Sequence, residues 1–395
     1  MLFQTMLKEN REKQIIPNLN ALRFISAFFV FLVHYFNYIN PSQVYKSQIT
    51  QCLYHYLISK GNLGVNFFFV LSGFLITHLL IAEKNLTGSI SVKNFYLRRI
   101  LRIWPIYYFI FFLGFFIYPL LTSKFSLPAL SEHATWFAAF LGNIDRSYTD
   151  FTGIGCDLLG IMWTVSVEEQ FYLFWPLLFF CFSSRKLMVL VFLLICFSLA
   201  FRIYNFTDYR FIYFHTFSVM SDLLVGCFAA FAINEYPTLK FKIENLSNNT
   251  IRFFYLSFFS FLLFQKELYM VIPLLDYFDR LIFSLFCISI ILHQAYSKTG
   301  FKVGQIRYLE NWGIISYGFY ALHLLSIMFF QKLLLILKIE ASDTSIYFLL
   351  GIVLTFSISI IISNLSYNYF ESPFLKLKEG YVNKGDLNRL ATPER

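Results

Sequence analysis

The stretch that decides the fold is LNALRFISAFFVFLVHYFNYI, residues 19–39, which is apolar over the length of a membrane span yet holds Arg23 and His34. A helix needs roughly 20 mainly apolar residues to cross the hydrocarbon core of a bilayer. The rest of the chain has a similar character, because 57% of its 395 residues are hydrophobic and only 14% are charged. Soluble domains carry about 25% charged residues. The sequence therefore predicts an integral membrane protein.

Further apolar stretches have the length of a span or come close to it. Together with the first, they cover approximately residues 19–39, 62–82, 103–122, 166–182, 187–204, 212–233, 251–264, 277–296, 314–337 and 345–366. The fourth and the seventh are short for a span. We predict an all-α fold, a polytopic transmembrane helix bundle of about ten spans.

Lysines and arginines indicate the orientation, because loops on the cytoplasmic side of a membrane carry the excess of positive charge. With both termini in the cytoplasm, most of the 32 lysines and arginines fall in inner loops and tails. We therefore predict a cytoplasmic N-terminal tail (1–18), an integral membrane domain (19–372) and a cytoplasmic C-terminal tail (373–395). The net charge of +9 then reflects orientation, and we expect no nucleic-acid partner.

Arg23 and His34 are the ionisable residues of the first span. Their spacing places both on one helix face, roughly 16 Å apart along the axis. Ionisable residues inside a membrane usually face the protein interior or a cavity and are candidates for function. Two alternatives stay open: Arg23 snorkels to the cytoplasmic interface, and His34 makes a structural hydrogen bond.

A cluster of arginines lies in NFYLRRILRIWPIYY, residues 94–108, ahead of the third span. Arg98, Arg99 and Arg102 share one face if the segment is helical. Guanidinium groups suit phosphates because they offer fixed pairs of donors. Anchoring by positive charge at the inner interface is the alternative interpretation.

Two adjacent acids, Glu168 and Glu169, open the fourth span in WTVSVEEQFYLFWPLLFF, residues 163–180. Under the expected orientation they enter the membrane from outside, at a depth similar to that of His34. A carboxylate beside an imidazole fixes its tautomer and raises its basicity, as general-base catalysis requires. Two solvated acids at the interface are the alternative.

Motifs in a fixed order make the chain resemble the acyltransferase-3 family of bacterial integral membrane acyltransferases, which includes O-antigen and other polysaccharide O-acetylases. They are LNALRFISAFFVFLVHYF (19–36), GVNFFFVLSGFLI (64–76), FYLRRILRIWPIYY (95–108), WTVSVEEQFYLFWPLL (163–178), and the pair ISYGFYALH (315–323) and YNYFESPFLKLK (367–378).

The resemblance assigns residues as well. His34 matches the essential histidine of the family, Arg23 its partner arginine, and Glu168 the acid of the SVE element. Arg99 and Arg102 match the required arginine pair. Further motif positions, to which we assign no role, are Ser72, Gly73, Phe74, Glu169, Ser316, Tyr317, His323 and Glu371.

By the same resemblance, the chain is an acetyl-CoA-dependent O-acetyltransferase. It would move an acyl group from cytoplasmic acyl-CoA to a hydroxyl of a cell-surface glycan, such as lipopolysaccharide O-antigen, capsule or exopolysaccharide, or of a lipid-linked saccharide. Arg98, Arg99 and Arg102 would bind the phosphates of the donor, with its pantetheine arm passing Arg23. His34 would act as general base or carry the acyl group itself. We expect a multi-pass protein in the lipid bilayer of a bacterial inner membrane.

The composition also allows three other functional classes. A non-catalytic membrane scaffold or receptor would explain the aromatic content of the sequence but not the shared helix face of Arg23 and His34. A transporter or flippase of a glycan or lipid-linked intermediate also holds charged residues in the membrane, but such proteins usually show two similar halves with broken helices, which this sequence lacks. The six cysteines and seven histidines show no ligand spacing, so we expect no bound metal and no permanent cofactor.

The chain departs from the family pattern at one motif. Relatives often carry an arginine before the helix that here reads HTFSVMSDLLVG (215–226), where Val219 stands in its place and Asp222 is retained. This substitution makes the acceptor harder to infer. The hydrolase-like extracytoplasmic domain of some relatives is not in the sequence, so we expect the chain to act alone or with a separate partner.

Overall fold

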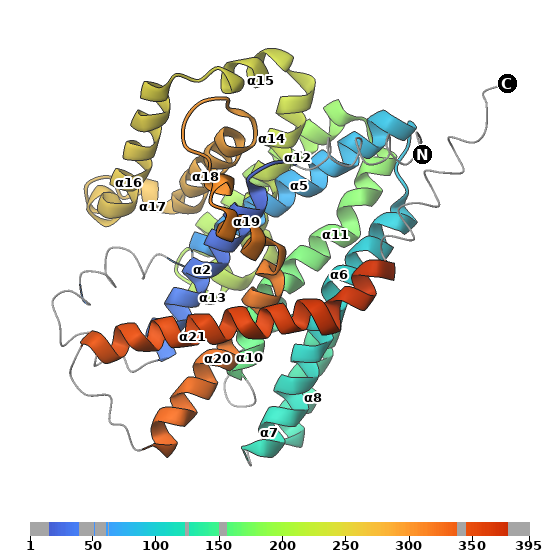
Figure 1. The fold of residues 1–395 in the computed structure, drawn as a ribbon. Coiled ribbons are helices and arrows are strands. Elements are labelled where there is room, and N and C mark those ends of the chain that lie inside the picture. Colours follow the sequence, from blue (N-terminus) through green and yellow to red (C-terminus); the bar gives the residue numbers. More distant parts are fainter. Residues whose placement is uncertain are drawn as a thin grey trace, which may run out of the picture. The chain divides into compact units, whose positions relative to one another are not determined.

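The structure is a computed structural model that describes residues 16–38, 51, 61, 63–122, 126–149, 156–337 and 345–377 (Figure 1). Within these ranges the regular structure is helical and no strand occurs, which confirms the all-α prediction. Contacts divide the chain into two compact units. Unit 1 comprises residues 1–89, 183–212 and 217–316, and unit 2 comprises residues 90–182, 213–216 and 317–395.

Several helices have the length and apolar character of membrane spans. In the described part of the chain there are 8, at Leu19–Tyr38, Leu63–Thr87, Val92–Leu121, Ser184–Tyr204, Tyr209–Glu235, Asp279–Tyr296, Ser316–Ile336 and Leu350–Leu377. They coincide with eight of the ten predicted spans, and the protein is a multi-pass membrane protein.

The two remaining predicted spans, 166–182 and 251–264, are helical but lack the combination of length and apolar character that a membrane span needs. They lie on α11 (Trp163–Cys181) and α16 (Asn248–Val271). The run Glu168, Glu169 and Gln170 lowers the mean hydropathy of α11. α16 carries Lys266 and Glu267 in its second half.

Unit 1 is built around α2 (Leu19–Tyr38), which packs against α5 (Leu63–Thr87), α18 (Asp279–Tyr296) and α19 (Arg307–Ile314). Its other helices are α12 (Ser184–Tyr204), α14 (Thr216–Glu235, of which Thr216 falls in unit 2), α15 (Pro237–Glu244), α16 and α17 (Leu274–Tyr277), with a 3-10 turn η4 at Val303–Gln305. The short α13 (Tyr209–Phe214) spans the boundary between the units.

Two glycines bring α5 and α14 into backbone contact within unit 1. A Cβ atom at Gly73 would lie 1.9 Å from the carbonyl oxygen of Leu223, and one at Gly226 would lie 2.1 Å from that of Val70. Small residues allow such close approach between membrane helices, where packing rather than the hydrophobic effect holds helices together. Gly73 of the SGF motif therefore has a packing role.

Unit 2 contains α6 (Val92–Phe112), which continues through a π-helical turn η2 (Leu113–Ile117) into α7 (Tyr118–Leu121). Then follow α8 (Leu127–Ala138), α9 (Gly142–Tyr148), α10 (Cys156–Leu159), a 3-10 turn η3 (Gly160–Met162) and α11. The last elements are α20 (Ser316–Ile336), α21 (Ser345–Leu365) and the π-helical η5 (Ser366–Glu371).

The corner between α8 and α9 meets the middle of the continuous helix Val92–Leu121, in the second half of α6. The Tyr107 hydroxyl donates to the Phe137 carbonyl (2.6 Å), and the rings of Tyr107 and Phe140 lie 4.2 Å apart. Within the corner, His133 Nδ1 lies 2.8 Å from the Asp145 carboxylate. Burial raises the pKa of the Asp145 carboxyl, and the bond to His133 opposes this rise.

α11 begins beside this corner and runs antiparallel to the first half of α6. The Gln170 amide near the start of α11 donates to the Phe140 carbonyl (2.8 Å), whereas the Tyr96 hydroxyl near the start of α6 donates to the Leu173 carbonyl (2.6 Å). α11 therefore starts part way along the continuous helix Val92–Leu121, because α8 and α9 turn back before it. This placement brings its acids into the interior of unit 2.

Candidate functional site

The start of α2 is held by a carboxylate from α19. Glu310 accepts hydrogen bonds from the Asn20 amide (2.8 Å) and from the backbone N–H of Ala21 (3.3 Å). The first N–H groups of a helix lack partners within it, and a negative charge is favourable there. Arg23 in turn donates to the Asn20 amide oxygen (3.2 Å). Glu310 therefore positions Arg23 through Asn20.

Arg23 and His34 are both half-buried in unit 1. α2 is continuous from Leu19 to Tyr38, so the predicted arrangement on one face, roughly 16 Å apart along the axis, follows from regular helix geometry. Glu168 belongs to unit 2. The pairing of its carboxylate with His34 stays a prediction.

The predicted arginine cluster lies on α6 in unit 2, where Arg98, Arg99 and Arg102 are all half-buried. The guanidinium carbon of Arg99 lies 5.6 Å from the ring centroid of Phe95 and 5.1 Å from that of Tyr172. Two aromatic rings thus fix the orientation of the Arg99 guanidinium.

Arg99 and Arg102 make no hydrogen bond or ion pair with any residue that the structure describes. A guanidinium carries five N–H donors and holds its positive charge under all ordinary conditions. Two such groups, one of them held between rings, can take up an anion by paired hydrogen bonds. This property supports the predicted role in binding phosphate.

Glu169 lies beside the arginine cluster. Its Oε2 atom accepts a hydrogen bond from the Trp104 indole N–H (2.9 Å), and its Oε1 atom is buried with no hydrogen-bond partner among the described residues. The charges of Glu168 and Arg99 act on each other as well. The carboxylates therefore balance part of the positive charge on α6.

The depth that we predicted for these acids was wrong. We expected Glu168 and Glu169 at the outer end of a span and the arginines at an inner end. The bond from Trp104, only two positions after Arg102, places Glu169 at the level of the arginines. The physical reason is that α11 begins part way along the continuous helix Val92–Leu121. Hydropathy records the apolar character of a helix but not the level at which the helix begins.

The last two motifs reach the same part of unit 2. The Tyr317 hydroxyl at the start of α20 donates to the Ile103 carbonyl on α6 (2.9 Å). Glu371 in η5 is buried, accepts from the Ser366 hydroxyl (3.2 Å), and is subject to the charge of Arg102. The motifs on α6, α11, α20 and η5, far apart in the sequence, therefore meet in one region of one unit.

The remaining motif positions lie in buried or half-buried surroundings. Phe74 is fully buried and stacks on His78, with ring centroids 6.0 Å apart. Ser72 is half-buried on the same helix. The buried Ser316 donates to the Gly313 carbonyl (2.8 Å). His323 is fully buried, and its Nδ1 donates to the Tyr320 carbonyl one turn earlier (2.7 Å).

A closed network of polar side chains next to Glu169 was not foreseen. The Gln170 amide donates to Asn143 (2.7 Å), the Asn143 amide donates to the Thr216 hydroxyl (2.8 Å), and that hydroxyl donates back to Gln170 (2.6 Å). The sequence gave one indication of this network, because Gln170 is a polar residue directly after the two acids in an otherwise apolar helix. The network holds α11 rigidly where it carries Glu168 and Glu169.

The departure from the family pattern has a structural counterpart in unit 1. Val219 is buried on α14, and Asp222 pairs with Arg280 of α18 (2.6 Å) and accepts from the Ser284 hydroxyl (2.7 Å). The buried acid therefore receives its guanidinium from another helix. An ion pair of this kind, fully desolvated, is costly to break by removing one partner.

Comparison with known proteins agrees with the motifs. The sequence profile of the acyltransferase-3 family, described as an acyltransferase domain, matches residues 16–364. The peptidoglycan O-acetyltransferase OatA of Listeria monocytogenes is 27% identical over 342 residues, which are 82% of this chain and 52% of that protein. The O-acetyltransferase OatA of Staphylococcus aureus (strain NCTC 8325) is 32% identical over 185 residues, or 44% of this chain and 30% of that protein.

The chain thus spans about half the length of the Listeria relative, of which it covers 52%. No solved structure matches it. The family profile, by contrast, extends over most of the chain and includes every predicted site residue except Glu371. The protein belongs to the acyltransferase-3 family.

Proposed function

We propose that the protein is a membrane-embedded O-acetyltransferase that moves an acetyl group from acyl-CoA to a hydroxyl of a cell-surface glycan. Membership of the acyltransferase-3 family supports the reaction class. The names of the two relatives support acetyl as the group transferred, and the name of the Listeria protein supports a cell-wall glycan as acceptor. The location would be the inner membrane of a bacterium.

The observation that carries the proposal is the pair of guanidinium groups on α6. Arg99 and Arg102 have no anionic partner within hydrogen-bond distance in the described ranges, although both are half-buried. Half-buried guanidinium donors without an acceptor in the described chain are open to an acceptor from a ligand. Coenzyme A carries phosphate groups that would supply acceptors for these donors. Glu168 and Glu169 would then limit the net charge of the site when no donor is bound.

The chemistry needs one base near the acceptor. In the proposed reaction the acceptor oxygen forms a bond to the thioester carbonyl carbon while the imidazole of His34 takes the hydroxyl proton. The carbon–sulfur bond then breaks, and the imidazolium returns the proton to the leaving coenzyme A thiolate. In the alternative, the acyl group passes first to the imidazole and then to the acceptor.

The proposal can be tested by mass spectrometry of total cell-surface glycan. Cells that lack the native gene would express the wild-type chain, His34→Ala or Phe29→Ala at matched membrane levels. Phe29 is an exposed residue of the same helix and serves as the control. We expect an acetyl mass shift with the wild type and Phe29→Ala, and none with His34→Ala.

Isotope-labelled acetyl-CoA supplied to inverted membrane vesicles would identify the donor. Transfer of the label to glycan supports acetyl-CoA as the donor. Absence of any acyl shift in all three strains would refute the glycan acceptor. Equal shifts in all three would show that His34 has a structural role, and the mechanism above would be wrong.

A further inference from the structure

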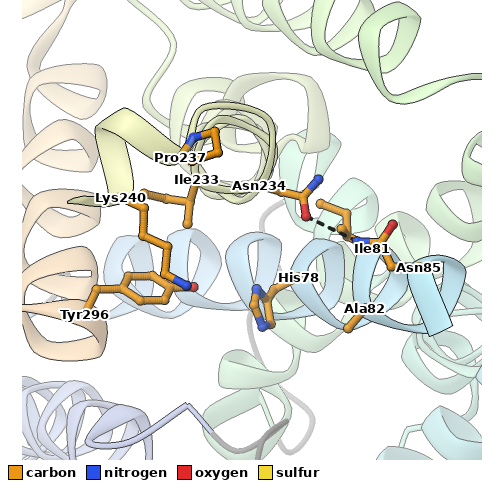
Figure 2. A pocket seen from close by; sticks show the side chains of 9 residues that line it. All are labelled: His78, Ile81, Ala82, Asn85, Ile233, Asn234, Pro237, Lys240 and Tyr296. Atoms are coloured by element: carbon orange, nitrogen blue, oxygen red, sulfur yellow. Dashed lines mark hydrogen bonds between the residues drawn. The ribbon is translucent and has the colours of Figure 1, made fainter. Parts of the chain in front are cut away.

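Unit 1 contains a cavity of about 350 Å³ that none of the motifs accounts for (Figure 2). It lies between the second half of α5, the end of α14, the start of α15 and the end of α18. Its polar lining consists of His78, Asn85, Asn234, Lys240 and Tyr296, and the remaining walls are aliphatic side chains and a proline. Ligand sites of this kind are mostly apolar with a few placed polar groups.

Polar groups at one end of the cavity lack partners. The Tyr296 hydroxyl is buried and makes no hydrogen bond within the described chain. The Lys240 ammonium lies 5.5 Å from the centroid of the Tyr296 ring and forms no ion pair with a described residue. A ligand that carries an anionic oxygen to this end would give the buried Tyr296 hydroxyl an acceptor and the exposed Lys240 ammonium a counter-charge.

The other end of the cavity carries two side-chain amides, and its middle carries the ring of a histidine. Asn85 and Asn234 are joined by a hydrogen bond (3.3 Å) and lie across the cavity from Lys240 and Tyr296 (Figure 2). Asparagine side chains pair well with the edge of an adenine ring. The imidazole of His78 lies between the two ends and is supported by Phe74, with an interplanar angle of 20°.

These features together fit a purine ring that carries a phosphate on its sugar. The amides match the edge of the base, the apolar walls and the imidazole match its faces, and the ammonium and phenol match the phosphate. The volume of the cavity lies within the usual range for small-molecule sites.

We propose that this pocket binds the adenosine 3′-phosphate end of the acyl-CoA donor, with the phosphate at Lys240 and the base between His78 and the asparagines. This inference rests on the proposed function, because it assumes that the donor is an acyl-CoA. It adds a donor-binding site that lies outside every family motif of the sequence. A lipid headgroup or free phosphate shares the anionic chemistry, so the test separates these sources.

The test compares coenzyme A with dephospho-coenzyme A, which lacks only the 3′-phosphate. Affinities would be measured by calorimetry with the full chain in phosphatidylcholine nanodiscs. We expect the wild type to bind coenzyme A about tenfold more tightly than dephospho-coenzyme A. Lys240→Gln should bind the two equally. Lys242→Gln, an exposed lysine on the same helix that does not line the cavity, should behave as the wild type.

A second variant tests the site of the base. Ala82 lines the cavity, so Ala82→Phe should fill the space and weaken binding of both nucleotides about tenfold or more. Lys240 lies on an exposed surface, so Lys240→Gln is expected to fold even if Ala82→Phe does not. Unfolding temperatures of both variants would be recorded beside the affinities.

Three outcomes would overturn the inference. Equal preference for coenzyme A in the wild type and Lys240→Gln, with acetyl transfer intact, would refute the pocket but leave the proposed function standing. Binding of phosphatidylglycerol or inorganic phosphate that depends on Lys240, without any competition with coenzyme A, would assign the pocket to those anions. A wild type that neither binds coenzyme A nor transfers acetyl would refute the proposed function and this inference with it.

Discussion

Gly73→Ala should destabilise unit 1 by opening the contact between α5 and α14. The new Cβ would lie 1.9 Å from the Leu223 carbonyl oxygen and 2.6 Å from its carbonyl carbon. Carbon and oxygen atoms in helix contacts normally lie about 3.3–3.6 Å apart, so the backbones must separate by roughly 1.4 Å at this point. Leu223 presents backbone atoms, which cannot turn away as the tip of a side chain can.

Overpacking of this kind costs about 1–3 kcal/mol, which corresponds to a fall in Tm of about 3–10 °C. The assay is thermal unfolding of the purified protein in detergent, followed by size-exclusion chromatography. Gly160→Ala is the matched control, because its new Cβ would meet only the flexible end of Arg146 at 3.0 Å. Gly226→Ala should lower the free energy of unfolding less in the Gly73→Ala background than in the wild type, because the two helices have already separated there. A Tm of Gly73→Ala within 1 °C of the wild type, on the order of the assay error, would refute the reasoning.

Three further predictions concern the site and its supports. Glu310→Ala should lower stability by about 1–2 kcal/mol, because the start of α2 loses its cap, and should reduce acetyl transfer because Arg23 is no longer positioned. Arg99→Lys should raise the KM for acyl-CoA about tenfold with a smaller change in kcat, because lysine lacks the planar group that stacks on Tyr172 and pairs with phosphate. Partial burial lowers the pKa of Lys302 from 10.5 to about 8. Between these pH values the unfolded chain therefore binds more protons than the folded chain. The contribution of Lys302 to the free energy of unfolding should then rise as the pH rises through this range.

Each of these predictions has its own control. Glu310→Gln retains an acceptor and should lose less stability than Glu310→Ala; equal losses would contradict the capping role. An unchanged KM in Arg99→Lys would contradict a direct contact with the donor. For Lys302 the comparison is the change in Tm between pH 7.5 and pH 10 in the wild type and in Lys302→Met. The two curves should run parallel if burial of this lysine has no effect on stability.

Much of the fold could be predicted from the positions of the apolar stretches in the sequence. Eight of the predicted spans coincide with the 8 helices of the described chain that have the length and hydropathy of a span. For α11, the apolar pattern predicted the helix but not its position. Its two adjacent acids, Glu168 and Glu169, indicated a helix end at the membrane surface, but the structure places Glu169 against Trp104 of α6 within unit 2. Such a placement depends on α8 and α9 turning back, which no local pattern of the sequence records.

The candidate site was predictable only where a motif carried the residue. Arg99, Arg102 and Glu169 were found from spacing and resemblance, and the structure places Glu169 against Trp104, two positions after Arg102. Glu310 was not found, because nothing in its own surroundings indicates that it contacts α2. A contact between distant segments follows from the packed fold and leaves no trace in the residues nearby.

The hydrogen bond between Asn20 and Glu310 has a consequence for the order of events during synthesis of the chain. The two residues are 290 positions apart. Translation proceeds at about 5–20 residues per second, so roughly 15–60 s pass between synthesis of the two residues. During that interval the Ala21 N–H and the Asn20 amide lack the Glu310 carboxylate. The contacts of Glu310 with the start of α2 can therefore form only late in synthesis, and a chain truncated before α19 would lack them.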